Sequence, residues 1–163
     1  MVNFGMFRGM VTQITEFPIS ADGTGDGCYK LIRLEDGPGG VVEFVAGPGT
    51  YFVDQAIVNV GDGVTGYYDR NAPVPLIYPP RYQALVLVKE SPGMNVKVDQ
   101  FDRQLVSSDG MLKLNVAPYT QLRLTNGQPF KGELANRNLI VMYGPSTMSI
   151  PAQTTPYKII VWC

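Results

Sequence analysis

Residues 68–88 read YDRNAPVPLIYPPRYQALVLV, and this stretch organises the predicted fold. Four prolines lie between residues 73 and 80, and proline lacks the backbone N–H that helices and inner strands use. The apolar run 84–88 then follows as the most hydrophobic strand of the first half. The pattern predicts a proline-rich crossing between two strands, with Tyr68 before it and Tyr82 after it.

A similar plan recurs near the C-terminus, where residues 143–162 read YGPSTMSIPAQTTPYKIIVW. An offset of 75 residues (143 minus 68) places Tyr68 on Tyr143 and Tyr82 on Tyr157. Each half then has a tyrosine, a proline-broken crossing, a second tyrosine and a closing apolar strand. These matches are few, so they do not distinguish a tandem duplication from chance similarity, and the sequence leaves both interpretations open.

The composition indicates short strands joined by tight turns. Gly 18 and Pro 13 together make 31 of the 163 residues, without a collagen-like period, and they separate runs rich in Val, Ile, Leu and Tyr. Hydrophobic residues make up 45% of the chain, which is enough for a buried core. We expect an all-β protein with about eleven strands and at most one or two short helices.

Two turns predict hairpins from their local chemistry. The segment 36–40 (DGPGG) separates two strand-like runs, as a hairpin loop does. Asn126-Gly127 follows the alternating run 120–125 and is the strongest hairpin signal in the chain. Residues 50–60 fit a short helix and a strand equally well, so their structure stays open.

The segment 90–93 (ESPG) is a polar break after the first closing strand and the best candidate for a domain boundary. We therefore expect one β module at residues 1–90 and a second at residues 91–163, packed against the first. Each half is expected to be a small barrel or sandwich. The first half has five expected strands, with an interruption between the third and the fourth. This pattern is compatible with an OB-like barrel.

The two proline-rich segments carry a resemblance to known proteins. Residues 72–82 (APVPLIYPPRY) and 149–161 (SIPAQTTPYKIIV) look like motifs of an uncharacterised family of small bacterial β proteins, chiefly from Gram-positive lineages. The second motif is also similar to segments of repeat proteins labelled copper-amine-oxidase-N-terminal-like or stalk domains. The resemblance covers most of residues 40–162 and implies no established activity. The copper label does not carry over, because the chain has no histidine.

The absence of histidine excludes several kinds of active site. Ser-His-Asp and Cys-His nucleophilic sites, and imidazole-based zinc, copper and iron sites, all require that side chain. Asp99 and Asp102 lie close together in the segment VDQFD, but neighbouring acids on a strand edge are usually solvated, so we expect no catalysis from them. We expect no enzymatic activity, no cofactor and no transition metal.

Residues 22–27 (DGTGDG) resemble half of a calcium-binding loop, in which oxygen ligands alternate with glycines. Asp22 and Asp26 are the candidate ligands, but a third acid and a bidentate glutamate are missing at suitable spacing. A flexible turn is therefore the preferred interpretation. The two cysteines, Cys28 and Cys163, are too few for a disulfide scaffold.

The crossing has two interpretations. As a packing element it closes one end of a barrel, and its prolines lower the entropy of the unfolded chain. As a binding element it has the composition of a polyproline II ligand, or it presents tyrosine rings as a platform for a ligand. We prefer packing, with several of these side chains in one cluster. The residues concerned are Tyr67, Tyr68, Tyr78, Pro79, Pro80, Arg81 and Tyr82.

The last seven residues, 157–163 (YKIIVWC), carry a single charge and have strong β propensity. On an open sheet edge such a segment invites aggregation, so we expect it to be paired, either in its own sheet or with a second copy. The second option makes the protein a self-associating building block that Cys163 can cross-link. The assembly residues are Tyr157, Ile159, Val161, Trp162 and Cys163.

The remaining features limit the partners. A net charge of −1 provides no basic footprint for nucleic acid, and no run of 18 apolar residues predicts a membrane span. Residues 1–18 do not form a secretory signal, so the cytoplasm, or the interior of a sporulating cell, is the default location. The sequence favours a non-enzymatic structural or assembly module, of a cell-envelope or spore-associated layer. The alternative is an OB-like binding module that recognises a ligand or protein partner through its aromatic, proline-rich face.

Overall fold

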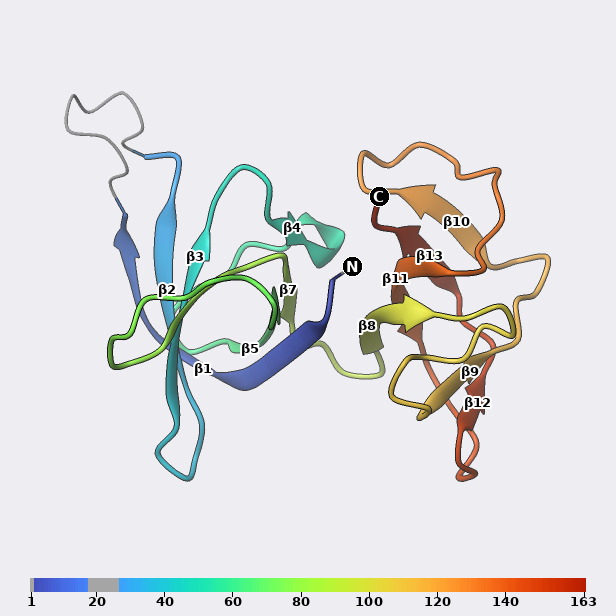
Figure 1. The fold of residues 1–163 in the computed structure, drawn as a ribbon, viewed down its shortest axis with the longest axis horizontal. Coiled ribbons are helices and arrows are strands. Elements are labelled where there is room, and N and C mark those ends of the chain that lie inside the picture. The colour runs from blue at the N-terminus through green and yellow to red at the C-terminus, as the bar shows by residue number, and fades with distance from the viewer. Residues whose placement is uncertain (1, 18–26) are drawn as a thin grey trace. The chain divides into compact units, whose positions relative to one another are not determined.

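The computed structural model describes residues 2–17 and 27–163. Their regular elements are strands, with the exception of one single-turn 3-10 helix, η1 (Val53–Gln55). The expected all-β class is therefore confirmed. The chain divides into two compact units, Met1–Glu90 and Ser91–Cys163, and each is described by itself (Figure 1).

The first unit contains a sheet with the strand order β4-β7-β5-β1-β2-β3-β6. Its strands are β1 (Phe4–Glu16), β2 (Lys30–Glu35), β3 (Val41–Ala46), β4 (Tyr51–Phe52), β5 (Gly63–Asp69), β6 (Arg81–Gln83) and β7 (Val86–Lys89). The pairs β1–β2, β2–β3, β1–β5 and β5–β7 are antiparallel. The pairs β3–β6 and β4–β7 are parallel, and each joins strands that lie far apart in the sequence.

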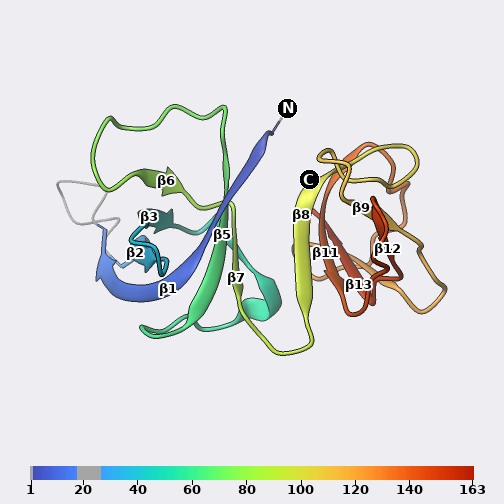
Figure 2. The same ribbon diagram turned by 90° about the horizontal axis from the view of Figure 1, so that it is seen from below.

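The long strand β1 connects the two halves of this sheet. Residues 4–10 pair with β5, whereas residues 10–16 pair with β2. The β1–β2 register shifts between Val11 and Gln13, and such an irregularity bends a strand and increases its twist. The strong curvature of β1 is visible in Figures 1 and 2.

The core of the first unit follows from alternation along its strands. In β3, Val42, Phe44 and Ala46 point into the core, as period-two geometry requires of residues on one face. The neighbouring strands contribute apolar residues to the same cluster. The buried members are Val11, Ile32, Leu34, Val42, Phe44, Ala46, Val64, Ala84 and Leu87.

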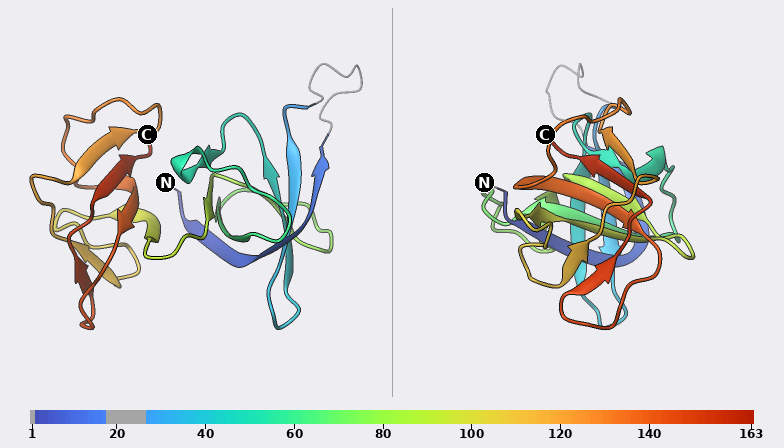
Figure 3. Two further views of the ribbon diagram at one scale, coloured as in Figure 1. Left: turned by 180° about the vertical axis from the view of Figure 1, so that it is seen from behind. Right: turned by 90° about the vertical axis from the view of Figure 1, so that its right-hand side faces the viewer.

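The second unit has its own sheets and its own core (Figure 3). One sheet has the order β10-β13-β11-β8, and β12 pairs separately with β9. The strands are β8 (Asn95–Phe101), β9 (Leu112–Leu114), β10 (Gln121–Leu124), β11 (Arg137–Tyr143), β12 (Ala152–Thr154) and β13 (Lys158–Val161). The buried core residues are Phe101, Leu112, Leu114, Leu139, Val141, Ile159 and Val161.

Both predicted hairpins are present. Residues 36–40 form the turn between the antiparallel strands β2 and β3, with the N–H of Asp36 donating to the carbonyl of Gly40. Asn126-Gly127 turns the chain back along β10: the N–H of Leu124 donates to the carbonyl of Gln128, the N–H of Phe130 donates to the carbonyl of Leu122, and Arg123 and Pro129 form an antiparallel bridge. This second hairpin is short, and β10 also pairs with β13 in parallel.

Parallel pairs of two to four residues occur in both units and give the strands a β-solenoid-like stacking. The sequence did not predict this feature, because parallel partners lie far apart in the chain and leave no local turn signal. An OB-like barrel for the first half stays a prediction.

Candidate binding surface of the first unit

Three aromatic rings fill the seam where β5 ends and β6 begins. The rings of Tyr68 and Tyr82 are stacked, with centroids 3.8 Å apart and planes inclined by 10°. Each ring centroid also lies 6.1 Å from that of Phe44 in the core. Burial, and after it the hydrogen bond with Tyr82, raises the pKa of Tyr68 above the ordinary 10.0, so its hydroxyl stays protonated at neutral pH. In this geometry the two tyrosines are packing residues.

The other face of the Tyr68 ring is occupied as well. A Cβ atom at Gly5 of β1 would lie 2.6 Å from Cζ of Tyr68, which is far inside van der Waals contact. Tyr68 is therefore enclosed between Gly5 and Tyr82. A planar ligand cannot stack on it without displacing one of them, so this geometry does not favour a platform of open ring faces.

The remaining residues of the predicted set have different environments. Tyr67 is buried, whereas Tyr78 is 80% exposed. Pro79 and Pro80 are half-buried, and the carbonyl of Pro80 accepts a hydrogen bond from the N–H of Glu43. The structure thus brings Tyr68 and Tyr82 together and leaves Tyr78 in solvent.

A buried carboxylate that the sequence did not single out holds β6 against β3. Glu43 is 5% exposed and forms ion pairs with Arg33 of β2, at 3.0 Å, and with Arg81 of β6, at 3.2 Å. The three residues form a row because Glu43 is paired in register with both. A charge with so little exposure requires such partners, so Arg81 has a structural role here. Its guanidinium also lies 5.3 Å from the ring centre of Phe17.

A pocket of about 340 Å³ lies beside the tyrosine stack. One wall is the first part of the crossing, and the opposite wall comes from β3, β5 and the segment that begins with β6. Most of the lining side chains are apolar, and Asp69, Arg81 and Gln83 are the polar ones. The lining residues are Val45, Tyr68, Asp69, Ala72, Pro73, Val74, Pro75, Arg81, Tyr82, Gln83 and Leu85.

The crossing continues past the pocket as a run of exposed apolar side chains. Figure 2 shows this connection from β5 to β6 as a long loop without strands. Leu76 is 101% exposed, and Val74, Ile77 and Tyr78 are exposed beside it in the sequence. Clustered apolar side chains in water mark interaction surfaces more often than single ones do. The pocket and these four residues are called the crossing surface below.

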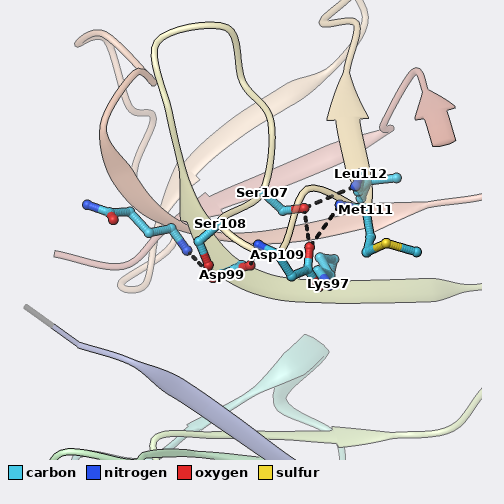
Figure 4. A network of polar contacts seen from close by, with 8 residues as sticks. Lys97, Asp99, Ser107, Ser108, Asp109, Met111 and Leu112 are labelled. Carbon is cyan, nitrogen blue, oxygen red and sulfur yellow. Dashed lines mark hydrogen bonds and ion pairs between the residues drawn. The ribbon is translucent and has the colours of Figure 1, made fainter. Parts of the chain in front are cut away.

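In the second unit, a polar network surrounds Asp99 of β8 and Asp109 of the loop between β8 and β9 (Figure 4). Asp99 is buried and accepts a hydrogen bond from the Ser108 hydroxyl. Asp109 accepts one from the Ser107 hydroxyl and forms an ion pair with Lys97. Burial raises the pKa of Asp109, but its hydrogen bonds with Lys97, Ser107 and the Met111 backbone outweigh burial and hold the pKa below 3.8.

These acids have structural partners that account for their positions. Asp102 accepts hydrogen bonds from the backbone N–H groups of Gln104 and Val106, which is the pattern of a turn-forming aspartate. Ser107 is buried, so its hydroxyl is not accessible to a substrate. The network therefore closes a loop, and its geometry does not bring Asp99 and Asp102 to a common site.

The C-terminal segment is paired within its own unit. Strand β13 lies between β10 and β11, so both of its edges have partners. Ile159 and Val161 are buried in the core, and their assignment as assembly residues is corrected: folded as described, they cannot contact a second copy. Tyr157 and Cys163 are exposed, and Trp162 is half-buried.

Residues 2–17 and 27–163, which the structure describes, contain neither a cluster of three or more metal-ligating side chains nor a helix suited to span a membrane. The calcium candidates Asp22 and Asp26 lie outside these described residues. Cys28 and Cys163 are free and exposed.

No protein-family model matches the chain, and no curated protein or solved structure matches it either. The proposed function therefore rests on the geometry of the chain itself.

Proposed function

We propose that the chain is a non-enzymatic binding module whose first unit recognises a protein partner through the crossing surface. One observation carries the proposal: a mostly apolar pocket is followed along the chain by three exposed apolar side chains outside its lining, Leu76, Ile77 and Tyr78. Protein interfaces are centred on such pockets, into which one or two side chains of the partner insert. The surrounding exposed residues then exclude water from the contact.

A protein partner fits this surface better than a small planar ligand does. The ring faces of Tyr68 are occupied, and a pocket of about 340 Å³ is near the small end of ligand sites, which span roughly 300–1,000 Å³. Leu76 and Tyr78 also extend the apolar surface beyond the pocket, where a small molecule would leave them exposed.

The strand connectivity supports an OB-like first unit as part of this proposal. β1 pairs with β2 and β5, and β2 pairs with β3. Residues 81–89 pair with both ends of this series, through β6 on β3 and β7 on β5. Five segments joined in this ring are the plan of an OB fold, in which the loop before the last strand is a binding loop, and the crossing has that position. The solenoid-like stacking is the competing description of the short parallel pairs.

The pairings also support a tandem duplication. Each of four strand pairs in the second unit has a counterpart in the first unit with the same orientation. The antiparallel pairs β8–β11 and β11–β13 correspond to β1–β5 and β5–β7. The parallel pairs β10–β13 and β9–β12 correspond to β4–β7 and β3–β6. The connection from β11 to β12 is then the equivalent of the crossing. It too exposes apolar side chains, Met148 and Ile150.

Assembly through the C-terminal strand is the weaker candidate function, because β13 is an inner strand with two partners. A structural role in a cell-envelope or spore layer, and membership of the bacterial family named above, stay predictions.

The proposal is tested by titrating the ¹⁵N-labelled protein with N-acetyl-leucinamide, an uncharged probe that carries one apolar side chain. We expect amide shifts confined to pocket residues such as Asp69, Gln83 and Leu85. Ala72→Trp places a large ring at the pocket wall and should abolish these shifts. Ser146→Trp, on the equivalent connection of the second unit, is the matched control and should leave them unchanged. Shifts elsewhere, or no shifts in a protein whose pocket is unoccupied, would contradict the proposed function.

A further inference from the structure

We propose that the partner is a second copy of this chain, and that the segment Leu76-Ile77-Tyr78 of each copy enters the pocket of the other. This inference rests on the proposed function and names its partner. The contact is isologous: the same surface of both copies meets itself across a two-fold axis.

The donor segment consists of apolar and aromatic side chains that are exposed to water. Leu76 is 101% exposed and Tyr78 is 80% exposed, and Ile77 between them is exposed as well. Residues 71–80 contain no charged side chain; the nearest charges are Arg70 and Arg81 at the two ends. Proline at four positions of the crossing limits its conformations, so less entropy is lost when the segment is fixed in a contact.

The receptor has the size and chemistry for these side chains. An engineered apolar cavity of about 150 Å³ accommodates benzene, so a pocket of about 340 Å³ has room for a leucine and part of a second side chain. Val45 and Leu85 supply apolar contacts. Gln83 is exposed at the pocket; its amide N–H donates to the Val45 carbonyl, and its amide oxygen can accept a hydrogen bond from the tyrosine hydroxyl of the donor.

The geometry of the crossing explains why the donor segment does not fill the pocket of its own chain. Ala72 to Pro75 form a wall of the pocket, and Leu76 follows immediately. Leu76 is fully exposed, so it does not occupy the pocket whose wall it continues. Donor and receptor are therefore adjacent on one surface, which is the arrangement that a two-fold pair requires.

The charges near the contact agree with self-association. Asp69 lines the pocket, and Arg70 beside it is exposed and hydrogen-bonded to Tyr68 of the pocket lining, so two copies can present opposite charges to each other at the rim. The net charge of −1 gives little repulsion between copies.

The main test compares two variants by sedimentation equilibrium over a range of concentrations. Leu76→Asn should raise the dimer dissociation constant at least tenfold, because each pair buries two of these leucine side chains and the burial of apolar surface drives the contact. Met148→Asn is the matched control: Met148 is also 101% exposed, but it lies on the second unit, and this variant should associate like the wild type. Equal loss in both variants would indicate unspecific association and overturn the inference.

A cross-linking experiment tests the contact itself. In a background with Cys28→Ser and Cys163→Ser, a protein with Leu76→Cys is mixed with one carrying Gln83→Cys and a short bis-maleimide. The mixed dimer should form rapidly, whereas Met148→Cys in place of Leu76→Cys should give little. Equal yields would overturn the proposed contact.

The two proposals can fail separately. If the wild type is monomeric at all concentrations and N-acetyl-leucinamide still binds in the pocket, the second copy is not the partner, although the binding function stands. If the Leu76→Asn variant, whose pocket is free, does not bind this probe, the proposed function fails.

Discussion

Replacement of Tyr82 with alanine removes the ring that joins the end of β5 to β6. This ring is half-buried, is stacked on Tyr68 at 3.8 Å and lies 6.1 Å from Phe44. Truncation of a fully buried aromatic residue costs about 3–5 kcal/mol, and half-burial reduces this to roughly half. The two ring contacts add about 1 kcal/mol in total. We therefore expect Tyr82→Ala to lower the free energy of unfolding of the first unit by about 2.5–3.5 kcal/mol.

Two further variants separate the ring from its hydroxyl and from general surface effects. Tyr82→Phe keeps the stack and loses the hydrogen bond with Tyr68, so it should cost about 1 kcal/mol. Tyr78→Ala removes an exposed ring and should change stability by less than about 0.5 kcal/mol.

Urea unfolding can follow the two units separately. The single tryptophan, Trp162, lies in the second unit, so its fluorescence serves as an internal control. Near-ultraviolet circular dichroism of the tyrosines reports mainly on the first unit, which holds six of the nine. With a slope near 1–2 kcal/mol per molar urea, Tyr82→Ala should lower its midpoint by at least 1 M. A change below about 0.5 kcal/mol would refute the described stack and restore the open-platform interpretation.

The other predictions concern a close contact, a titrating acid and the C-terminal strand. Gly66→Ala would place a Cβ 2.4 Å from the Phe44 ring and should cost about 1–3 kcal/mol in thermal or urea unfolding, whereas Gly49→Ala, with open space around it, should be nearly neutral. The pKa of Asp109 in the folded protein lies below 3.8, so its carboxylate stabilises the second unit at pH values above the pKa that it has in the unfolded chain. This stabilisation is lost as the pH falls through the folded pKa. Trp162 fluorescence should show the loss in the wild type and not in Asp109→Asn. Deletion of residues 157–163 removes an inner strand and should unfold the second unit, as measured by circular dichroism; a folded, monomeric product would instead support assembly through this strand.

The parts of the fold that local sequence determines were predictable. The turn at residues 36–40 joins adjacent strands, so its glycines and Asp36 were a sufficient signal. The all-β class was predictable because glycine and proline residues separate short apolar runs along the whole chain. At Asn126-Gly127 the local signal was equally strong, and the chain does turn back along β10. The parallel pairing of β10 with β13 had no such signal, because a contact between segments so far apart is set by tertiary packing, which no dipeptide encodes.

The candidate site was predictable only in part, for a related reason. Tyr68 and Tyr82 were found because they flank the crossing, and they do stack. Glu43 was missed because the run VVEFVA shows alternation but not which strand supplies the partners of the charge. The exposure of Leu76 was also missed: an apolar residue among prolines is typical of a packed crossing, and only the backbone path shows that it points into solvent.

Light scattering of the intact chain at two concentrations shows whether the crossing surfaces of two copies pair. We expect a mass that rises with concentration from 17.9 kDa towards twice that value, and a lower dimer fraction for Leu76→Asn than for Met148→Asn. A mass of 17.9 kDa for the wild type at millimolar concentration would contradict the proposed pairing of crossing surfaces.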